Sequence, residues 1–137
     1  MLCQAQATPK TLVFPEKHVL KINRTCKYTG ASIVTSELVD ALNWFFSEHW
    51  QMPIIADTGD CLFTTLNVKT SMVMASAYYA TMGFAVPAAI GYALTTGKRP
   101  LVLVGDGGFQ MTGPEICHCP HYNINPIFVV INNKRWG

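Results

Sequence analysis

Two polar side chains, each placed just after a strongly apolar run, have the clearest chemical potential in this sequence. Asp106 follows the run LVLV (101–104) and Gly105, and Asn133 follows the run IFVVI (127–131) and Asn132. Carboxylate and amide oxygens are hard ligands that suit Mg²⁺ or Ca²⁺ rather than a metal that prefers sulfur. If the two runs are neighbouring strands, both oxygens lie at one edge of a sheet and could share a divalent cation.

Glycines surround the acidic residue. Gly105, Gly107 and Gly108 carry no side chain, so their backbone N–H groups can approach an anion closely. A helix expected just downstream adds the positive end of its dipole. Oxygen ligands beside exposed N–H groups describe a metal ion that bridges to a diphosphate. Taken singly, however, GDGG and Asn132-Asn133 are each more typical of a turn that ends a strand.

The elements that must position these residues can be predicted from periodicity. A helix capped by Thr35 or Ser36, with Glu37 in its first turn, is expected to run to a stop at Pro53. PIIAD (53–57) is expected to form a buried strand, and the turn Thr58-Gly59-Asp60 follows it.

A second helix is expected over Gly83–Thr96, with Gly97 at its C-terminus. The run 101–104 is expected to be a strand, and Thr112-Gly113-Pro114-Glu115 has the spacing of a capping box that starts a helix to about Tyr122. The run 127–131 predicts the last strand. Short apolar strands that alternate with helices predict an α/β fold, a parallel sheet with helices on both faces. Ligands of such sheets bind at the C-terminal ends of the strands, where all three polar turns fall.

Composition excludes several classes of protein. The net charge is +2, and no Lys/Arg cluster indicates a nucleic-acid partner. Only 13% of the 137 residues are charged, which suggests surface that other domains or subunits cover. Five scattered cysteines and a first segment without an apolar leader favour a reducing cytoplasm. Residues 1–31 show no periodicity and are expected to be a linker, with the domain over 32–137.

A membrane span and a zinc site are both disfavoured by the sequence. The stretch from Thr70 to Gly97 has no charge and is long enough for a membrane span, but its polar residues, Pro87 and flanking strands disfavour that interpretation. Cys117, Cys119 and the histidines beside them do not have the spacing of a common zinc motif, and on a helix the two cysteines would point to different faces.

The spacing of the motifs also carries a family resemblance. GDG at 105–107, followed after 24 residues by Asn132-Asn133, resembles the thiamine-diphosphate-binding motif of decarboxylases and acetolactate synthases. TGDCLFTT (58–65), YYATMGFAVPAAIG (78–91) and LVGDGGFQMTGPEI (103–116) are similar to blocks of the phenylpyruvate and indolepyruvate decarboxylase branch. The resemblance extends from about Ser32 to Trp136, and relatives continue beyond it into further elements, so the domain is expected to be incomplete.

The resemblance implies roles for individual residues. Asp106, Asn133 and the backbone carbonyl of Arg135 would ligate Mg²⁺. Met82 would separate the thiazolium and pyrimidine rings of the bent cofactor, although by position alone a core methionine is the favoured interpretation. The Ala80 carbonyl would contact the pyrimidine amino group. The residues expected to contact thiamine diphosphate are Thr58, Gly59, Asp60, Ala80, Thr81, Met82, Gly105, Asp106, Gly107, Gly108 and Asn133.

The same resemblance implies the reaction and its partners. It implies decarboxylation of an aromatic or branched 2-oxo acid to an aldehyde and CO₂. Relatives activate the cofactor with a glutamate from a pyrimidine-binding domain, often that of a neighbouring subunit in a homodimer or homotetramer. No catalytic residue is therefore expected in this sequence, and the chain alone is expected to be inactive. An acetolactate-synthase-like carboligase and a non-catalytic domain that binds thiamine diphosphate remain alternatives.

Overall fold

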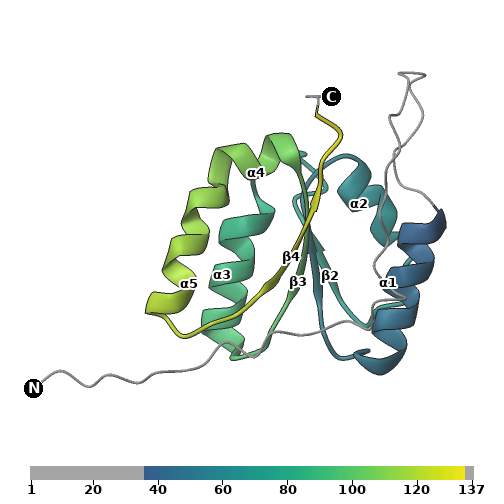
Figure 1. Cartoon of the computed structure of the whole chain (residues 1–137), viewed down its shortest axis with the longest axis horizontal. Helices are drawn as coiled ribbons and strands as arrows, with labels where there is room; N and C mark the ends of the chain where they lie inside the picture. The colour runs from purple at the N-terminus through teal and green to yellow at the C-terminus, as the bar shows by residue number, and fades with distance from the viewer. Residues whose placement is uncertain (1–35, 135–137) are drawn as a thin grey trace, which may run out of the picture.

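The structure is a computed structural model that describes residues 36–134. Helices and strands alternate along this part of the chain (Figure 1). In order they are α1 (Ser36–Glu48), β1 (Ile54–Ala56), α2 (Asp60–Thr65), β2 (Val73–Ala75), α3 (Ala85–Thr96), β3 (Leu101–Gly105), α4 (Asp106–Thr112), the 3₁₀ helix η2 (Gly113–Cys117), α5 (His118–His121) and β4 (Ile127–Ile131).

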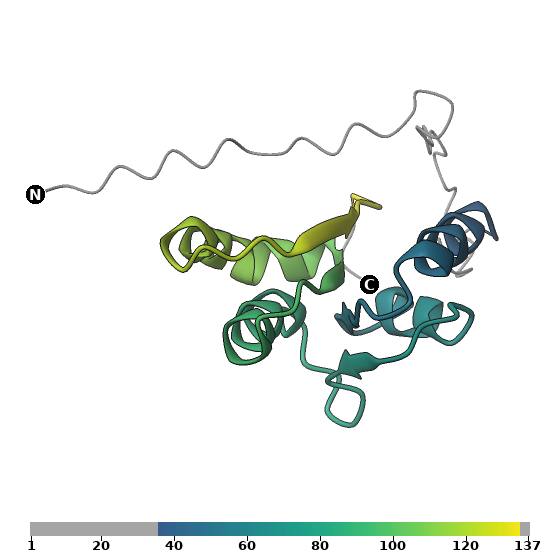
Figure 2. The same ribbon diagram turned by 90° about the horizontal axis from the view of Figure 1, so that it is seen from below.

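The strands form one parallel sheet in the order β2-β1-β3-β4. Figure 2 shows this sheet between two groups of helices, with α1 and α2 on one face and α3, α4 and α5 on the other. The predicted α/β architecture with helices on both faces is therefore confirmed.

Alternation along the central strands supplies both faces of the sheet with apolar side chains. Ile54 and Leu103 belong to a buried cluster with Leu42 and Phe46 of α1. Ile55, in between, belongs to a second cluster together with side chains of α3 and β3. Successive side chains of a strand point to opposite faces, so one run of apolar residues binds two helical layers. This explains why β1 is apolar throughout rather than alternating with polar residues.

The path of the chain reverses between β1 and β3. The chain leaves β1 through α2 to reach β2 on one side, and it then returns through α3 to β3 on the other side of β1. Helix α2 lies on the α1 face and α4 on the α3 face (Figures 1 and 2). The connections after these two neighbouring strands thus diverge at the upper edge of the sheet in Figure 1. Such a switch point is where open α/β sheets bind ligands.

The prediction of a single helix from about Thr112 to Tyr122 is wrong in its first residue and in its continuity. The helix begins already at Asp106, so GDGG is the start of α4 rather than a free turn. The chain then continues as η2 and α5. The Thr112 hydroxyl does not cap a helix but donates to the Gly83 carbonyl at 2.9 Å, because α3 lies alongside and offers a tertiary acceptor. Glu115 instead pairs with His118 at 3.2 Å.

Two elements, α2 and β2, were not expected from the sequence. Asp60 is the first residue of α2 rather than the end of a turn. Strand β2 is only three residues long and partly exposed, and it exists through its pairing with β1. No periodic pattern can develop over three residues, which is why the sequence did not reveal it. The uncharged stretch 70–97 thus forms β2, a loop and α3. None of the helices described between Ser36 and Lys134 has the length and apolar character that a bilayer crossing requires.

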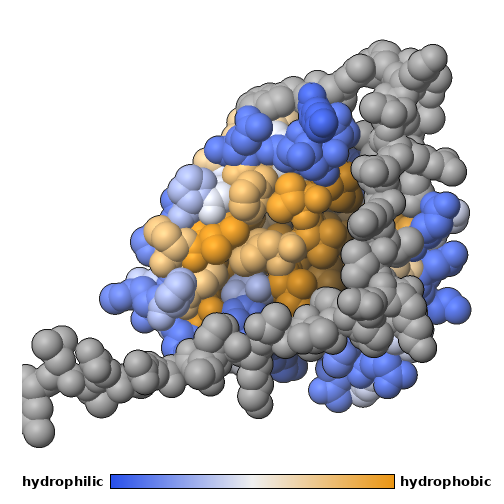
Figure 3. Space-filling view, in the orientation of Figure 1, coloured by the Kyte–Doolittle hydropathy of each residue, from blue (hydrophilic) through white to orange (hydrophobic). Residues whose placement is uncertain are grey.

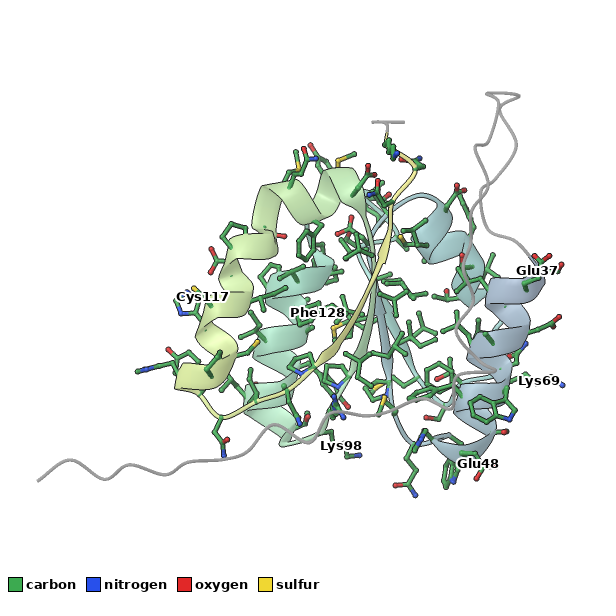
Figure 4. All side chains as sticks on the ribbon, in the orientation of Figure 1. Glu37, Glu48, Lys69, Lys98, Cys117 and Phe128 are labelled. Carbon is green, nitrogen blue, oxygen red and sulfur yellow. The ribbon has the colours of Figure 1, made fainter. Side chains whose placement is uncertain are left out.

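Strand β4 borders the sheet on its outer side. Its five residues are apolar, yet none of them is fully buried, and Val130 is 40% exposed. Figure 3 shows apolar residues across the centre of this view of the molecule, between hydrophilic groups at the top and bottom. Ile127, Val129 and Ile131 pack against the first cluster, whereas Phe128, labelled in Figure 4, packs against the second cluster on the α3 face. An apolar edge strand of this kind is a surface prone to pairing with another chain.

Two glycines, one within α3 and one directly after it, provide a test of this backbone. Gly97 ends the helix in the left-handed conformation (φ 67°), as predicted, whereas Gly91 lies within the helix and a methyl group there would meet no atom within 4 Å. We expect Gly97→Ala to lower the free energy of unfolding by about 1 kcal/mol. Gly91→Ala should raise it by about 0.5–1 kcal/mol, because alanine favours the helix. Urea unfolding of the two variants measures both changes in the free energy of unfolding. Changes of the same sign in the two variants would contradict a helix end at Gly97.

Candidate cofactor site

Parallel pairing brings the two predicted metal ligands to adjacent strand ends. Strands β3 and β4 pair as far as Gly105 and Ile131. Asp106 comes directly after the first strand, and Asn133 lies two residues after the second. The two strands are therefore neighbours, which is the condition for a metal ion shared by Asp106 and Asn133. Neighbouring strands lie about 4.8 Å apart. Both residues are half-buried, and they follow the strand ends that lie at the upper edge of the sheet in Figure 1.

Asp106 and the glycines that follow it form the first turn of α4. Gly105 precedes the helix in an extended conformation, and Gly107 and Gly108 are buried. Backbone N–H groups in a first helical turn have no acceptor within their own helix. The negative charge of Asp106 suits this end of the helix dipole.

The glycines of the proposed site differ in the physical reason for which glycine is required at each position. A methyl group on Gly108 would lie 3.3 Å from the Asp57 carboxylate, so close packing explains that residue. Gly59 has φ 71°, a conformation that other residues rarely adopt. Gly105 has an ordinary φ of −72°, and a methyl group there would meet no atom within 4 Å. Neither backbone conformation nor packing within the described chain therefore requires glycine at 105, and the space beside it is open.

The connection from β2 to α3 carries the other group of predicted site residues. The Ser76 hydroxyl donates to the Thr81 carbonyl at 3.2 Å, and the Ala80 N–H donates to the Ser76 carbonyl at 2.8 Å. These bonds form a compact loop in which Ala80 has φ 55°, an unfavourable conformation for a residue with a Cβ. Met82 is 38% exposed at the end of this loop, so the interpretation as a core methionine is wrong.

Asp57 is a residue of this edge that sequence reasoning assigned only to a strand. Its side chain is 2% exposed, and it lies on the same face of the sheet as Ile55. Its carboxylate accepts hydrogen bonds from the backbone N–H groups of Thr58 (2.9 Å), Gly83 (3.1 Å) and Ala85 (3.2 Å). The sequence did contain a signal for Asp57, because an acidic residue at the end of a fully apolar strand is rarely buried without partners that compensate its charge.

Cys61 lies in the first turn of α2, next to this edge. Burial raises the pKa of its thiol to about 12, and the negative charges of Asp57 and Asp60 contribute in the same direction. The thiol is therefore neutral near pH 7 and is a poor nucleophile. Its contacts are those of a small apolar side chain in the cluster beneath α1.

Two further cysteines lie in the described chain after α4, one in η2 and one in α5. Cys119 is buried, and burial raises the pKa of its thiol. Cys117 is exposed on the outer side of the helical segment (Figure 4). Over residues 36–134 no three His, Cys, Asp or Glu side chains are grouped as metal ligands. The predicted magnesium site contains a single carboxylate and does not depend on such a group.

The chain after β4 is described as far as Lys134. The Asn132 side chain accepts a hydrogen bond from the Lys134 N–H at 3.0 Å, and Lys134 adopts a left-handed conformation (φ 59°). The backbone therefore turns sharply here. Arg135, whose carbonyl was expected to be the third metal ligand, lies outside the described residues.

Several known proteins are similar to this chain in sequence. Indole-3-pyruvate decarboxylase from Azospirillum brasilense is 51% identical over 84 residues, which cover 61% of this chain and 15% of that protein. Pyruvate decarboxylase from Neurospora crassa is 33% identical over 87 residues, with the same coverages. The large subunit of acetolactate synthase from Lactococcus lactis is 50% identical over 58 residues, 42% of this chain and 10% of that subunit.

The chain thus spans about 15% of the length of the decarboxylases that it matches. Residues 57–137 match the family described as "Thiamine pyrophosphate enzyme, C-terminal TPP binding domain", where pyrophosphate is another word for diphosphate. This match begins at Asp57 and includes the connections after β1, β2, β3 and β4. The chain belongs to the thiamine pyrophosphate enzymes, and it carries their C-terminal cofactor-binding domain.

Proposed function

We propose that this chain is the diphosphate- and magnesium-binding part of a 2-oxo-acid decarboxylase that acts on an aromatic or branched substrate. The observation that carries the proposal is the parallel pairing of β3 with β4, which places GDGG and Asn132-Asn133 at adjacent strand ends. The identity with an indole-3-pyruvate decarboxylase supports the choice of reaction. The proposed domain covers residues 32–137, with 1–31 as a segment that leads into it.

The proposed metal ligands are the side chains of Asp106 and Asn133 and the backbone carbonyl of Arg135. All three donors are oxygen atoms, which fits Mg²⁺, a hard cation that keeps several ligands from water or phosphate. Asp106 lies at the start of a helix and Asn133 follows the next strand. A metal held here would neutralise part of the charge of a diphosphate bound to the same turn.

The diphosphate would contact backbone groups from two connections. Thr58, Gly59 and Asp60 come from the connection after β1, and Gly107 and Gly108 come from the start of α4. These connections diverge at the switch point between β1 and β3, the position expected for a ligand in this class of sheet. The open space beside Gly105 supports close approach of a ligand on this side.

The ring end of the cofactor would contact the loop between β2 and α3. Met82 is available at the surface to separate the two rings, and the carbonyl of Ala80 would accept a hydrogen bond from the pyrimidine amino group, with Thr81 between them. When bound, thiamine diphosphate supplies the carbon nucleophile for the 2-oxo acid and the electron sink for loss of CO₂. The chain itself binds and orients the cofactor.

The partner of this site would be a pyrimidine-binding domain, from the same or a neighbouring subunit, that supplies the activating glutamate. We propose a homodimer or homotetramer for the assembled enzyme, in the cytoplasm. The exposed aromatic residues Tyr78 and Tyr79, next to the ring end of the site, are available for such a contact. The second candidate is a carboligase, because an acetolactate synthase subunit is 50% identical over a shorter range.

Removal of the metal carboxylate tests the site directly. We expect Asp106→Ala to weaken Mg²⁺-dependent binding of thiamine diphosphate by more than about 100-fold, since a primary ligand is lost. Titration calorimetry with and without Mg²⁺ measures the change. Asp40→Ala removes an exposed carboxylate from α1 and serves as the matched control. Unchanged affinity in Asp106→Ala would refute the proposed metal site.

A methyl group at residue 105 tests the space reserved for the cofactor. Gly105→Ala should change the free energy of unfolding by less than about 1 kcal/mol, because the methyl group meets no protein atom. It should cost about 1–3 kcal/mol in binding of thiamine diphosphate with Mg²⁺, through overpacking against the ligand. Thermal unfolding and calorimetry on the same samples separate the two effects. Full affinity in this variant would mean that the cofactor does not lie beside Gly105.

The dependence on a second domain leads to a test of activity. With thiamine diphosphate, Mg²⁺ and phenylpyruvate, the 137-residue chain should form no aldehyde, because the activating glutamate would come from the pyrimidine-binding domain. A coupled alcohol dehydrogenase assay detects the aldehyde. Steady turnover by this polypeptide alone would contradict the proposed division of labour between domains.

A further inference from the structure

The carboxylate of Asp57 is an internal anion held by backbone N–H groups of the next residue and of one other segment, the chain that enters α3. It lies at the end of β1 and is 2% exposed. Both oxygens accept hydrogen bonds, Oδ1 from the N–H groups of Thr58 and Gly83 and Oδ2 from the N–H of Ala85. Buried acidic side chains are rare unless their charge is compensated in this way.

Two of these donors belong to the start of α3. Phe84, the residue before this helix, provides no side-chain cap. Asp57 replaces such a cap from a different element, and its negative charge is favourable at the positive end of the helix dipole. Gly83 is fixed from its other side as well, because its carbonyl accepts the hydroxyl of Thr112 at 2.9 Å. Met82, the proposed ring-separating residue, directly precedes this doubly held glycine.

The same carboxylate also lies opposite the first turn of α4, beside Gly108. A methyl group at Gly108 would lie 3.3 Å from Cγ and from Oδ2 of Asp57, a distance at which neighbouring atoms must move. Gly108 is buried and is one of the proposed diphosphate contacts. The Asp57 side chain therefore lies between the loop that carries Met82 and the turn that carries GDGG.

We propose that Asp57 is a positioning residue that fixes the ring-binding loop against the diphosphate-binding turn, so that the two ends of one cofactor are held at a set separation. This inference rests on the proposed function for the identity of the ligand, whereas the structural link between the loop and the turn does not. Asp57 would not touch the metal, since its oxygens are occupied by backbone donors.

The first test measures amide hydrogen exchange in the full 137-residue chain. Asp57→Asn replaces one acceptor oxygen by an N–H₂ group that faces another donor. Exchange in residues 76–85 should accelerate by at least about tenfold beyond the change in β1 and β3. Phe46→Leu is the control, because it perturbs the cluster on the opposite face. Acceleration in residues 76–85 no greater than in Phe46→Leu would overturn the proposal.

The second test uses two probes of different length, inorganic pyrophosphate and thiamine diphosphate, each with Mg²⁺. If Asp57 sets the separation of the two ends, Asp57→Asn should weaken binding of thiamine diphosphate by about tenfold and that of pyrophosphate by less than about threefold. Equal loss for both probes, or loss for neither, would overturn the proposal. Failure of the unaltered chain to bind either probe would refute the proposed cofactor site, and the exchange measurement would still decide the role of Asp57.

A variant at Gly108, which lies opposite the Asp57 carboxylate, keeps the proposal testable if the Asp57→Asn protein does not fold. Gly108→Ala leaves the carboxylate in place but adds a methyl group 3.3 Å from it. This variant should also accelerate exchange in residues 76–85, by at least about threefold. Unchanged exchange in that loop would show that the turn and the loop are not linked through Asp57. Gly91→Ala, at an exposed helical position without such a contact, is the matched control.

Discussion

The pairing of β1 with β3 is the constraint on which the rest of the molecule depends. These strands are neighbours in the sheet although β2 separates them in the sequence. Their side chains at 54–56 and 101–104 are almost completely buried, on both faces. Each isoleucine, leucine or valine among them contributes about 1.5–3 kcal/mol when it is removed from water. A shift by one residue would exchange the two faces of a strand and move Ile54 and Ile55 out of the clusters that they now belong to.

This pairing also creates the edge of the sheet that carries the proposed site. With β1 and β3 side by side, α2 and α4 leave to opposite faces of the sheet, and their first turns lie on either side of the switch point. The connections after β2 and β4 join the same edge because all four strands are parallel. Segments from four separate parts of the chain therefore meet without any long loop. The side chains of these segments can vary, while the apolar strands below them keep the distances between the segments.

A buried charge makes this edge rigid in one place. Removing a carboxylate from water is costly unless hydrogen bonds compensate for the lost hydration. Asp57 is stable inside the protein because three backbone N–H groups surround it, two of them at the start of α3. The compensation works only in this geometry, so the carboxylate and the loop before α3 constrain each other. The surface beyond this edge is different in character, since Tyr78, Tyr79 and β4 expose apolar groups.

The sequence by itself determined the features that depend on near neighbours. Apolar runs within 53–57, at 101–104 and at 127–131 indicated three strands, and their alternation with helices indicated a parallel sheet. Glycine at 97 specified the end of α3, because few other residues adopt its left-handed conformation. The order of polar motifs at strand ends also indicated the edge where we propose that the ligand binds, although not the geometry of the site.

Only the tertiary structure decided the features that depend on residues far apart in the chain. Strand β2 exists because β1 offers it a pairing partner. Thr112 donates to Gly83 rather than capping a helix, because α3 lies against it. Gly108 is explained by Asp57, whereas Gly105 is not explained by any contact within the described chain. The physical reason is common to these cases. A local pattern fixes which bonds a residue is able to form, but packing decides which partner is close enough to form them.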